Sequence, residues 1–173
     1  MKLPLACAAL LAVLALPLGA ISATDSSDGA RAEIRKVTDS LLERFYAARP
    51  RLVAEIRGAA GFAVFTTYSG NLIGTPGGGG GKGVGVARKG RDGPETFMAM
   101  AQTGTDAKAS LEREILIVFT TQKAFDDFAM HGWKAGSPGN EPGDAKVYSY
   151  AKDSVETGAS LAGTRFWSEG ALN

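Results

Sequence analysis

A glycine-rich segment followed by basic residues is the part of this sequence whose residue types could do chemistry. Five consecutive glycines lead into a strand-like alternation of glycine with other residues, and four cations lie in or just after it. Backbone N–H groups of a glycine loop can form a concave anion site, and Lys and Arg attract phosphate groups. The candidate anion-binding residues are therefore Gly77, Gly78, Gly79, Gly80, Gly81, Gly83 and Gly85, with the cations Lys82, Arg88, Lys89 and Arg91.

These glycines and cations each have a second interpretation. Glycine weakens a strand, because it loses the most entropy on folding and offers no side chain to pack. Alternate glycines over 81–85 therefore indicate close approach of another backbone, a sharp bend or a bound ligand. The cations could equally be a solvated hairpin surface. We expect the glycines to be mainly architectural and any lipid contact to come from the cations beside them.

Nucleotide and nucleic-acid binding are not expected. A phosphate-binding loop needs Ser or Thr after its Gly-Lys pair and a glycine five residues before it, but Gly83 and Pro76 occupy these positions. A dinucleotide-binding segment opens a helix, whereas the residues after these glycines predict a strand. The basic residues over 82–91 have no aromatic residues between them on which single-stranded nucleic acid could stack.

Few residues of this chain are suited to catalysis. His131 is the only histidine and Cys7 the only cysteine. A zinc site would need several such ligands, and no nucleophile elbow is present to support a catalytic triad. A carboxylate-only hydrolase would need two acids close together in a buried cleft. We expect a protein that is not an enzyme, with no catalytic residue, no metal site and no cofactor.

The segments around the glycine strand predict both helices and strands. Apolar residues at helical spacing predict an amphipathic helix over 34–48, and Pro50 suits the start of a second, short helix. The first helix could lie on a membrane, but we expect it to pack on the core of its own domain. Thr120 or Thr121 can cap a later helix. Strands are expected at 61–68, 82–88, 95–102, 114–120, 147–151 and 159–167.

The order of these elements predicts an α+β fold. Helices come first, several strands follow, and one short helix separates the later strands, which is not the alternation of a parallel sheet. The turn residues over 90–94 predict a hairpin between the strands 82–88 and 95–102. Strand glycines permit corner bends. We expect a mostly antiparallel, strongly curved or barrel-like β-sheet with N-terminal amphipathic helices.

The first 23 residues have the pattern of a secretory signal peptide. Lys2 precedes an apolar run over 5–18, and Ala20 and Ala23 offer cleavage sites. The run is shorter than the roughly 20 residues of a membrane span. Cleavage would leave a flexible segment, 24–30, and a single domain over 31–173. We expect secretion across the inner membrane, to the periplasm or membrane periphery of a Gram-negative bacterium.

Four motifs follow one another along the chain. They are Ala59-Ala60-Gly61-Phe62-Ala63-Val64-Phe65, the glycine strand 77–86, Ile115-Leu116-Ile117-Val118-Phe119, and Gly158-Ala159-Ser160-Leu161-Ala162-Gly163-Thr164. In this order they resemble the SYLF domain family, most closely its exported bacterial branch, over about residues 35–173. The endings 164–167 and 172–173 are also typical of that branch. The segment 104–111 departs from the family, which usually has a second glycine-rich stretch there.

The resemblance implies binding of phosphoinositides or other anionic phospholipids, to which an amphipathic helix and basic residues contribute. By position, these would be the helix 34–46 with Lys82, Arg88 and Lys89. We therefore expect non-enzymatic binding of anionic phospholipids at a bacterial envelope membrane, with no nucleic acid or nucleotide as partner.

The alternative is a structural or protein-interaction module of the envelope, with an envelope protein as its partner. The aromatic residues of the last strands could form an interface, although such residues also build cores. They are Tyr148, Tyr150, Phe166 and Trp167.

Overall fold

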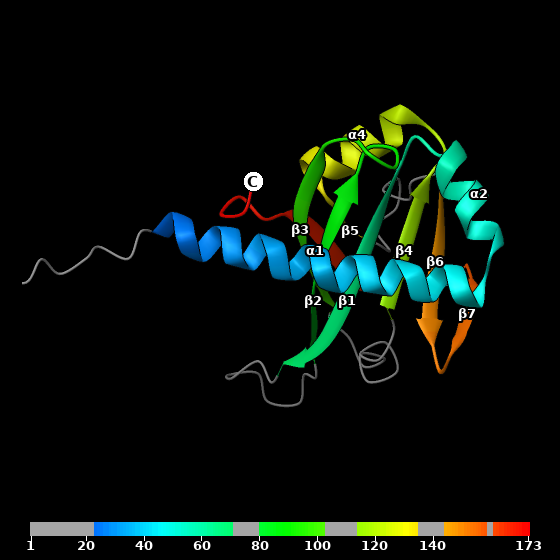
Figure 1. Ribbon diagram of the computed structural model, residues 1–173, viewed down its shortest axis with the longest axis horizontal. Coiled ribbons are helices and arrows are strands. Elements are labelled where there is room, and N and C mark those ends of the chain that lie inside the picture. Colours follow the sequence, from blue (N-terminus) through cyan, green and yellow to red (C-terminus); the bar gives the residue numbers. More distant parts are fainter. Residues whose placement is uncertain (1–22, 71–79, 103–113, 135–143, 159–160) are drawn as a thin grey trace, which may run out of the picture.

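The structure is a computed structural model, which describes residues 23–70, 80–102, 114–134, 144–158 and 161–173 (Figure 1). Within these residues the chain forms three helices and one eight-stranded sheet. The helices are α1 (Ala23–Ala48), α2 (Arg51–Gly58) and α4 (Gln122–His131). The strands are β1 (Gly61–Gly70), β2 (Gly80–Arg88), β3 (Glu95–Gln102), β4 (Glu114–Phe119), β5 (Trp133–Lys134), β6 (Ala145–Ala151), β7 (Ser154–Thr157) and β8 (Thr164–Ser168).

The sheet is antiparallel throughout and strongly curved. Its strand order is β5-β8-β3-β2-β1-β4-β6-β7. The predicted hairpin is present, since β2 pairs with β3 and Arg88 lies opposite Glu95. The edge strands β5 and β7 do not pair with each other in the described part of the chain, so the sheet is half a barrel. The predicted α+β class with a curved antiparallel sheet is confirmed.

Alternating residues of the central strands pack into two separate cores, one on each face of the sheet. On β1, Phe62 and Val64 point towards α1 and α2, whereas Ala63 and Phe65 point to the opposite face, which α4 covers. Figure 1 shows α1 running across one face of the sheet. Because both faces are covered, the central strands are apolar on both sides, as the continuous run in β4 indicates.

The sheet curves towards the face that α4 covers. Phe65 on β1 and Phe166 on β8 are separated by the two strands β2 and β3. In a flat sheet three strand spacings amount to about 14 Å. The two ring centroids are nevertheless 4.8 Å apart. This contact is possible because the strands between them fold inwards and the nearer one, β2, carries glycine on that face.

Two glycines of β2 make room for their neighbours across the strand. A Cβ at Gly83 would lie 2.5 Å from the carbonyl oxygen of Thr66 and 2.7 Å from Cγ of Met100. A Cβ at Gly85 would clash with the carbonyl oxygen of Val64 and lie 2.5 Å from the Phe65 ring. These glycines therefore allow close approach and curvature, and their inner face is filled by protein. Gly77, Gly78 and Gly79 lie outside the described residues, as does the segment 104–111.

Three details differ from the sequence-based expectations. The segment 24–30 belongs to α1, whose first turns are held by Arg31: its side chain pairs with Asp28 at 2.8 Å and donates to the carbonyl of Leu172 at 2.8 Å. The segment 152–158, which lies between the expected strands 147–151 and 159–167, contains β7, because Lys152 and Asp153 adopt positive φ and close a two-residue hairpin turn. The last strand begins at Thr164 rather than 159, after a turn at Gly163 with φ +77°.

We predict that Gly85→Ala destabilises the fold by about 3 kcal/mol, because the added methyl group must displace backbone or the Phe65 ring. Urea unfolding would measure the change. Gly29→Ala is the matched control, since a Cβ there meets nothing within 4 Å and alanine favours the helix by up to about 1 kcal/mol. Equal stability of the two variants would contradict the architectural role of Gly85.

Candidate functional site

The four predicted cations do not form one cluster. Lys82 and Arg88 stand six residues apart on β2, which corresponds to about 20 Å along a strand. Lys89 and Arg91 belong to the turn between β2 and β3, residues 89–94, which we call the 89–94 turn. Lys82 is exposed at the far end of the strand and is not part of the same site.

Arg88 is a structural residue. Its side chain is 16% exposed and pairs with Asp39 at 2.7 Å and Glu95 at 2.8 Å. Glu95 also accepts a bond from Arg35 at 2.6 Å. Burial lowers the pKa of Arg88, but its hydrogen bonds and charge pairing with Asp39 and Glu95 outweigh this effect and raise the pKa above its ordinary value. Two carboxylates already neutralise Arg88 and fasten the hairpin to α1, so its charge is less accessible to a lipid phosphate than that of an exposed cation. The predicted lipid contact of Arg88 stays a prediction.

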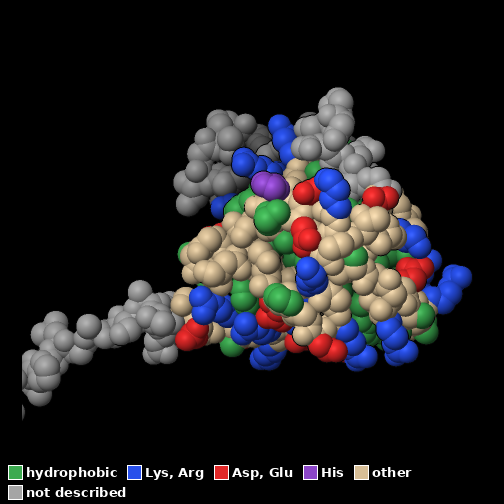
Figure 2. Space-filling view, turned by 90° about the horizontal axis from the view of Figure 1, so that it is seen from above, with side chains coloured by type: hydrophobic (Ala, Val, Ile, Leu, Met, Phe, Trp, Pro, Cys, Tyr) green, Lys and Arg blue, Asp and Glu red, His purple; other side chains and the backbone are tan. Residues whose placement is uncertain are grey.

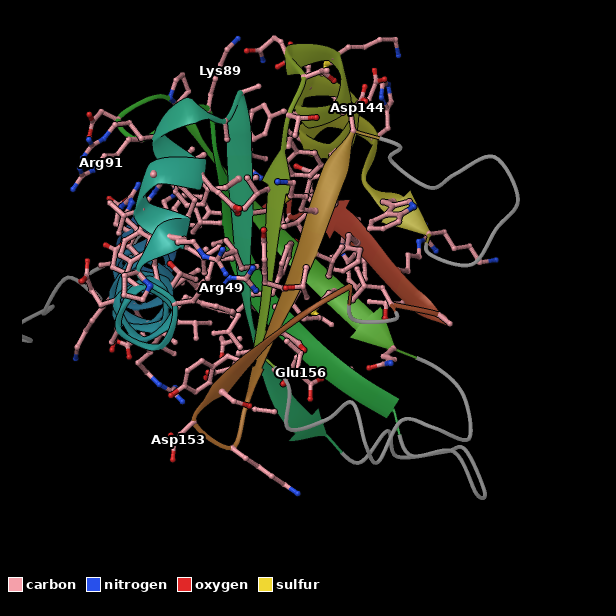
Figure 3. The ribbon with its side chains drawn as sticks, turned by 90° about the vertical axis from the view of Figure 1, so that its right-hand side faces the viewer. Arg49, Lys89, Arg91, Asp144, Asp153 and Glu156 are labelled. Carbon is pink, nitrogen blue, oxygen red and sulfur yellow. The ribbon has the colours of Figure 1, made fainter. Side chains whose placement is uncertain are left out.

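Lys89 and Arg91 leave the 89–94 turn in different directions (Figure 3). Both side chains are exposed. Lys89 lies 3.9 Å from Asp126 of α4, an exposed pair that contributes little. Arg91 has no ion-pair partner among the described residues. These two cations of the predicted set therefore remain available to an external anion.

Two further cations, which the sequence did not single out, lie on α2. Leu52 and Ile56 are buried, so the outward face of this helix carries Arg51, Ala54 and Arg57, all exposed. The spacing i, i+3, i+6 in the predicted helix was the signal that could have identified them.

The 89–94 turn packs beside the end of α2, because Gly90 N–H donates to the carbonyl of Ala60 at 3.1 Å. The exposed residues of the turn therefore lie close to the C-terminal end of α2, and we call them, together with the outward face of that helix, the helix–turn surface. Figure 2 shows Lys and Arg side chains along the right and lower-right rim, on the side where α2 lies, with Asp and Glu side chains beside some of them. The helix–turn surface consists of Arg51, Ala54, Arg57, Lys89 and Arg91.

Arg49 lies at the corner between α1 and α2, and its side chain contacts other residues of the protein. Its guanidinium lies 5.1 Å from the ring centre of Tyr148 and donates to Thr157. The Tyr148 hydroxyl donates to Glu55 at 2.5 Å. Burial, followed by the hydrogen bond and charge of Glu55, raises the pKa of Tyr148 to about 12. Figure 3 shows Arg49 on the inner side of the corner.

A groove separates α1 from the 89–94 turn, and we call it the α1–turn groove. Its volume is about 320 Å³. One wall is α1, the other is the turn, and the floor is apolar. The lining residues are Asp39, Leu42, Glu43, Tyr46, Phe62, Arg88, Arg91 and Asp92.

The apolar side of α1 is not available to a bilayer. Leu41, Leu42 and Phe45 are at most 8% exposed and pack on the sheet. The expectation that this helix packs on its own core is confirmed. No helix in the described residues is long and apolar enough to span a membrane.

The aromatic residues considered for a protein interface are mostly core residues. Tyr148 and Phe166 are 1% exposed and Tyr150 is 7% exposed. Only Trp167 among the four is half-buried. Tyr148, Tyr150 and Phe166 therefore belong to the two cores of the curved sheet, as the second interpretation of these aromatic residues expects, and the protein-interaction alternative stays a prediction. His131 ends α4 and is exposed. No group of three His, Cys, Asp or Glu side chains in the described part is placed to hold a metal ion.

Comparisons with models of protein families and with curated proteins found no match to this chain.

We predict that Glu95→Gln destabilises the fold by about 2 kcal/mol at pH 7, since it weakens charge-assisted bonds from Arg35 and Arg88. Burial alone would raise the pKa of Glu95, but those two bonds outweigh it and lower the pKa. The carboxylate therefore stabilises the fold fully above the unfolded value of 4.5, and this contribution is lost as the pH falls through the folded value.

Urea unfolding at a series of pH values would test this. The difference between wild type and Glu95→Gln should be largest near neutrality and shrink below pH 4.5. The control is Glu33→Gln, which changes an exposed residue of α1. It should change stability by less than about 0.5 kcal/mol. A difference that is independent of pH would contradict the assignment.

Proposed function

We propose that this protein binds anionic phospholipid surfaces of a bacterial envelope and is not an enzyme. The observation that carries the proposal is the helix–turn surface, where Arg51, Arg57, Lys89 and Arg91 are exposed together on two packed elements. The resemblance to the SYLF domain family supports the same function. The contact surface differs from the one first expected, since Arg88 is neutralised and Lys82 is remote.

The strength of such binding follows from its charges. A cation near an anionic membrane contributes about 1 kcal/mol. Four of them therefore supply about 4 kcal/mol, which corresponds to a dissociation constant near the millimolar range. Asp92 and Asp126 reduce this further. The proposal is thus a weak, reversible and salt-sensitive association with a membrane surface, rather than insertion into it.

Removing three cations of the helix–turn surface should abolish most of this binding. In co-sedimentation with phosphatidylglycerol vesicles, the variant Arg51→Gln/Arg57→Gln/Lys89→Gln should bind roughly 100-fold more weakly than wild type, at about 1 kcal/mol per charge. The control Lys36→Gln/Lys82→Gln/Lys134→Gln removes the same charge from exposed sites elsewhere. It should retain most of the binding. Equal losses in both variants, or equal binding to phosphatidylcholine vesicles, would overturn the proposal.

We propose export as the route to that surface, from the signal-peptide pattern of residues 1–23, of which 1–22 lie outside the described part. The intact mass of protein released by osmotic shock from an expressing Gram-negative cell should lack 20 or 23 residues. Full-length protein confined to the cytosol would contradict export.

A further inference from the structure

The α1–turn groove differs in charge from the helix–turn surface beside it. Its walls carry the cations Arg88 and Arg91 and the carboxylates Asp39, Glu43 and Asp92. The groove therefore has one more negative than positive charge, and a simple anion would meet repulsion as well as attraction. A ligand that carries both signs of charge would suit it better.

Some of these charges are already used. Asp39 pairs with Arg88 at 2.7 Å, and this pair closes one end of the groove. Glu43 and Asp92 are exposed, and like Arg91 they have no ion-pair or hydrogen-bond partner within the described ranges. The groove thus offers one cation and two carboxylates to a ligand.

The groove also has an apolar floor and a hydroxyl donor. Phe62 is 2% exposed and Leu42 is 8% exposed. Tyr46 is half-buried beside them, and its hydroxyl makes no hydrogen bond to the described residues. Arg91 and Glu43 line the same groove as this phenol, one on each wall. A ligand phosphate next to Arg91 could therefore accept a second hydrogen bond from Tyr46.

We propose that the α1–turn groove binds a phosphoethanolamine group, with its phosphate on Arg91 and Tyr46 and its ammonium on Glu43 and Asp92. The volume of about 320 Å³ is at the lower end of the range for small-ligand sites, which suits a headgroup. A primary ammonium donates N–H bonds to carboxylates, whereas a quaternary ammonium is recognised by an aromatic cage. The groove presents carboxylates on both walls and a single half-buried tyrosine.

The group could belong to a phospholipid or to a free phosphodiester. In the first case the inference rests on the proposed function, since the membrane would present the headgroup. The 89–94 turn supplies Lys89 and Arg91 to the helix–turn surface and Arg91 to the groove, so a surface-bound protein would hold the groove close to the headgroups.

Vesicle binding separates this inference from the proposed function. Two sets of vesicles contain the same fraction of phosphatidylglycerol. The remaining lipid of the bilayer is phosphatidylethanolamine in one set and phosphatidylcholine in the other. We expect the purified protein to bind the phosphatidylethanolamine vesicles about tenfold more tightly, as for a single charge-assisted hydrogen bond. Glu43→Gln and Arg91→Gln should abolish this preference, and Glu33→Gln and Lys36→Gln, exposed on α1 outside the groove, should keep it.

A soluble ligand distinguishes the two sources. Glycerophosphoethanolamine and glycerophosphocholine are titrated into the protein, and the NMR signals of Tyr46 and Arg91 are followed. Saturable shifts with the first compound alone, lost in Glu43→Gln, would show that the free group suffices. No shifts, together with the vesicle preference, would assign the site to membrane lipid.

The outcomes separate the two ideas. The groove assignment would be overturned if the protein bound both sets of vesicles equally and neither soluble compound shifted the NMR signals. It would also be overturned if the preference for phosphatidylethanolamine persisted in Glu43→Gln. Neither result would contradict the proposed binding through the helix–turn surface. A persistent preference without any dependence on phosphatidylglycerol would overturn the proposed function instead. Unfolding midpoints near wild type confirm that each exposed variant is folded.

Discussion

The fold depends on one contact that the backbone must bend to make. Phe65 and Phe166 lie with ring centroids 4.8 Å apart although two strands separate them in the sheet. This contact requires that the inner face of β2 be nearly free of side-chain atoms. Gly83 and Gly85 meet this requirement, and Met100 and Phe65 occupy the space beside them. Once the sheet is curved, α4 can place Phe128 against both rings, and the inner core becomes continuous.

Curvature also decides which charges reach the surface. Bending of the sheet brings the end of β2 under α1, where Arg88 forms ion pairs with Asp39 and Glu95. The same end carries the 89–94 turn outward, beside the C-terminal end of α2. A basic segment that is contiguous in sequence is therefore divided: one cation holds the hairpin to the helix, and two point to solvent. The candidate binding surface then includes Arg51 and Arg57, which lie on another element.

Local patterns carried much of the architecture. Period-two alternation in β1, the turn residues at 90–94 and the cap at Thr121 each act over a few residues, and each is present as expected. The expectations that were wrong have two different causes. The early start of α1 is supported by a bond from Arg31 to the distant Leu172, whereas β7 follows a two-residue turn in which Lys152 and Asp153 adopt the positive φ that glycine more often provides. The candidate site was predicted in part, since exposure at Lys89 and Arg91 follows from the turn, but the neutralisation of Arg88 does not.

The sequence by itself determined the class of fold, the curved antiparallel sheet and the shortage of catalytic side chains. These depend on residue type, short-range periodicity and steric freedom of glycine, all of which are local properties. The tertiary structure alone decided which cations are free, that a groove with both signs of charge lies beside them, and that the last aromatic strands are core. Each of these depends on which residues meet across the sheet. A charge in the sequence has no assigned partner until folding places a carboxylate beside it or leaves it in water.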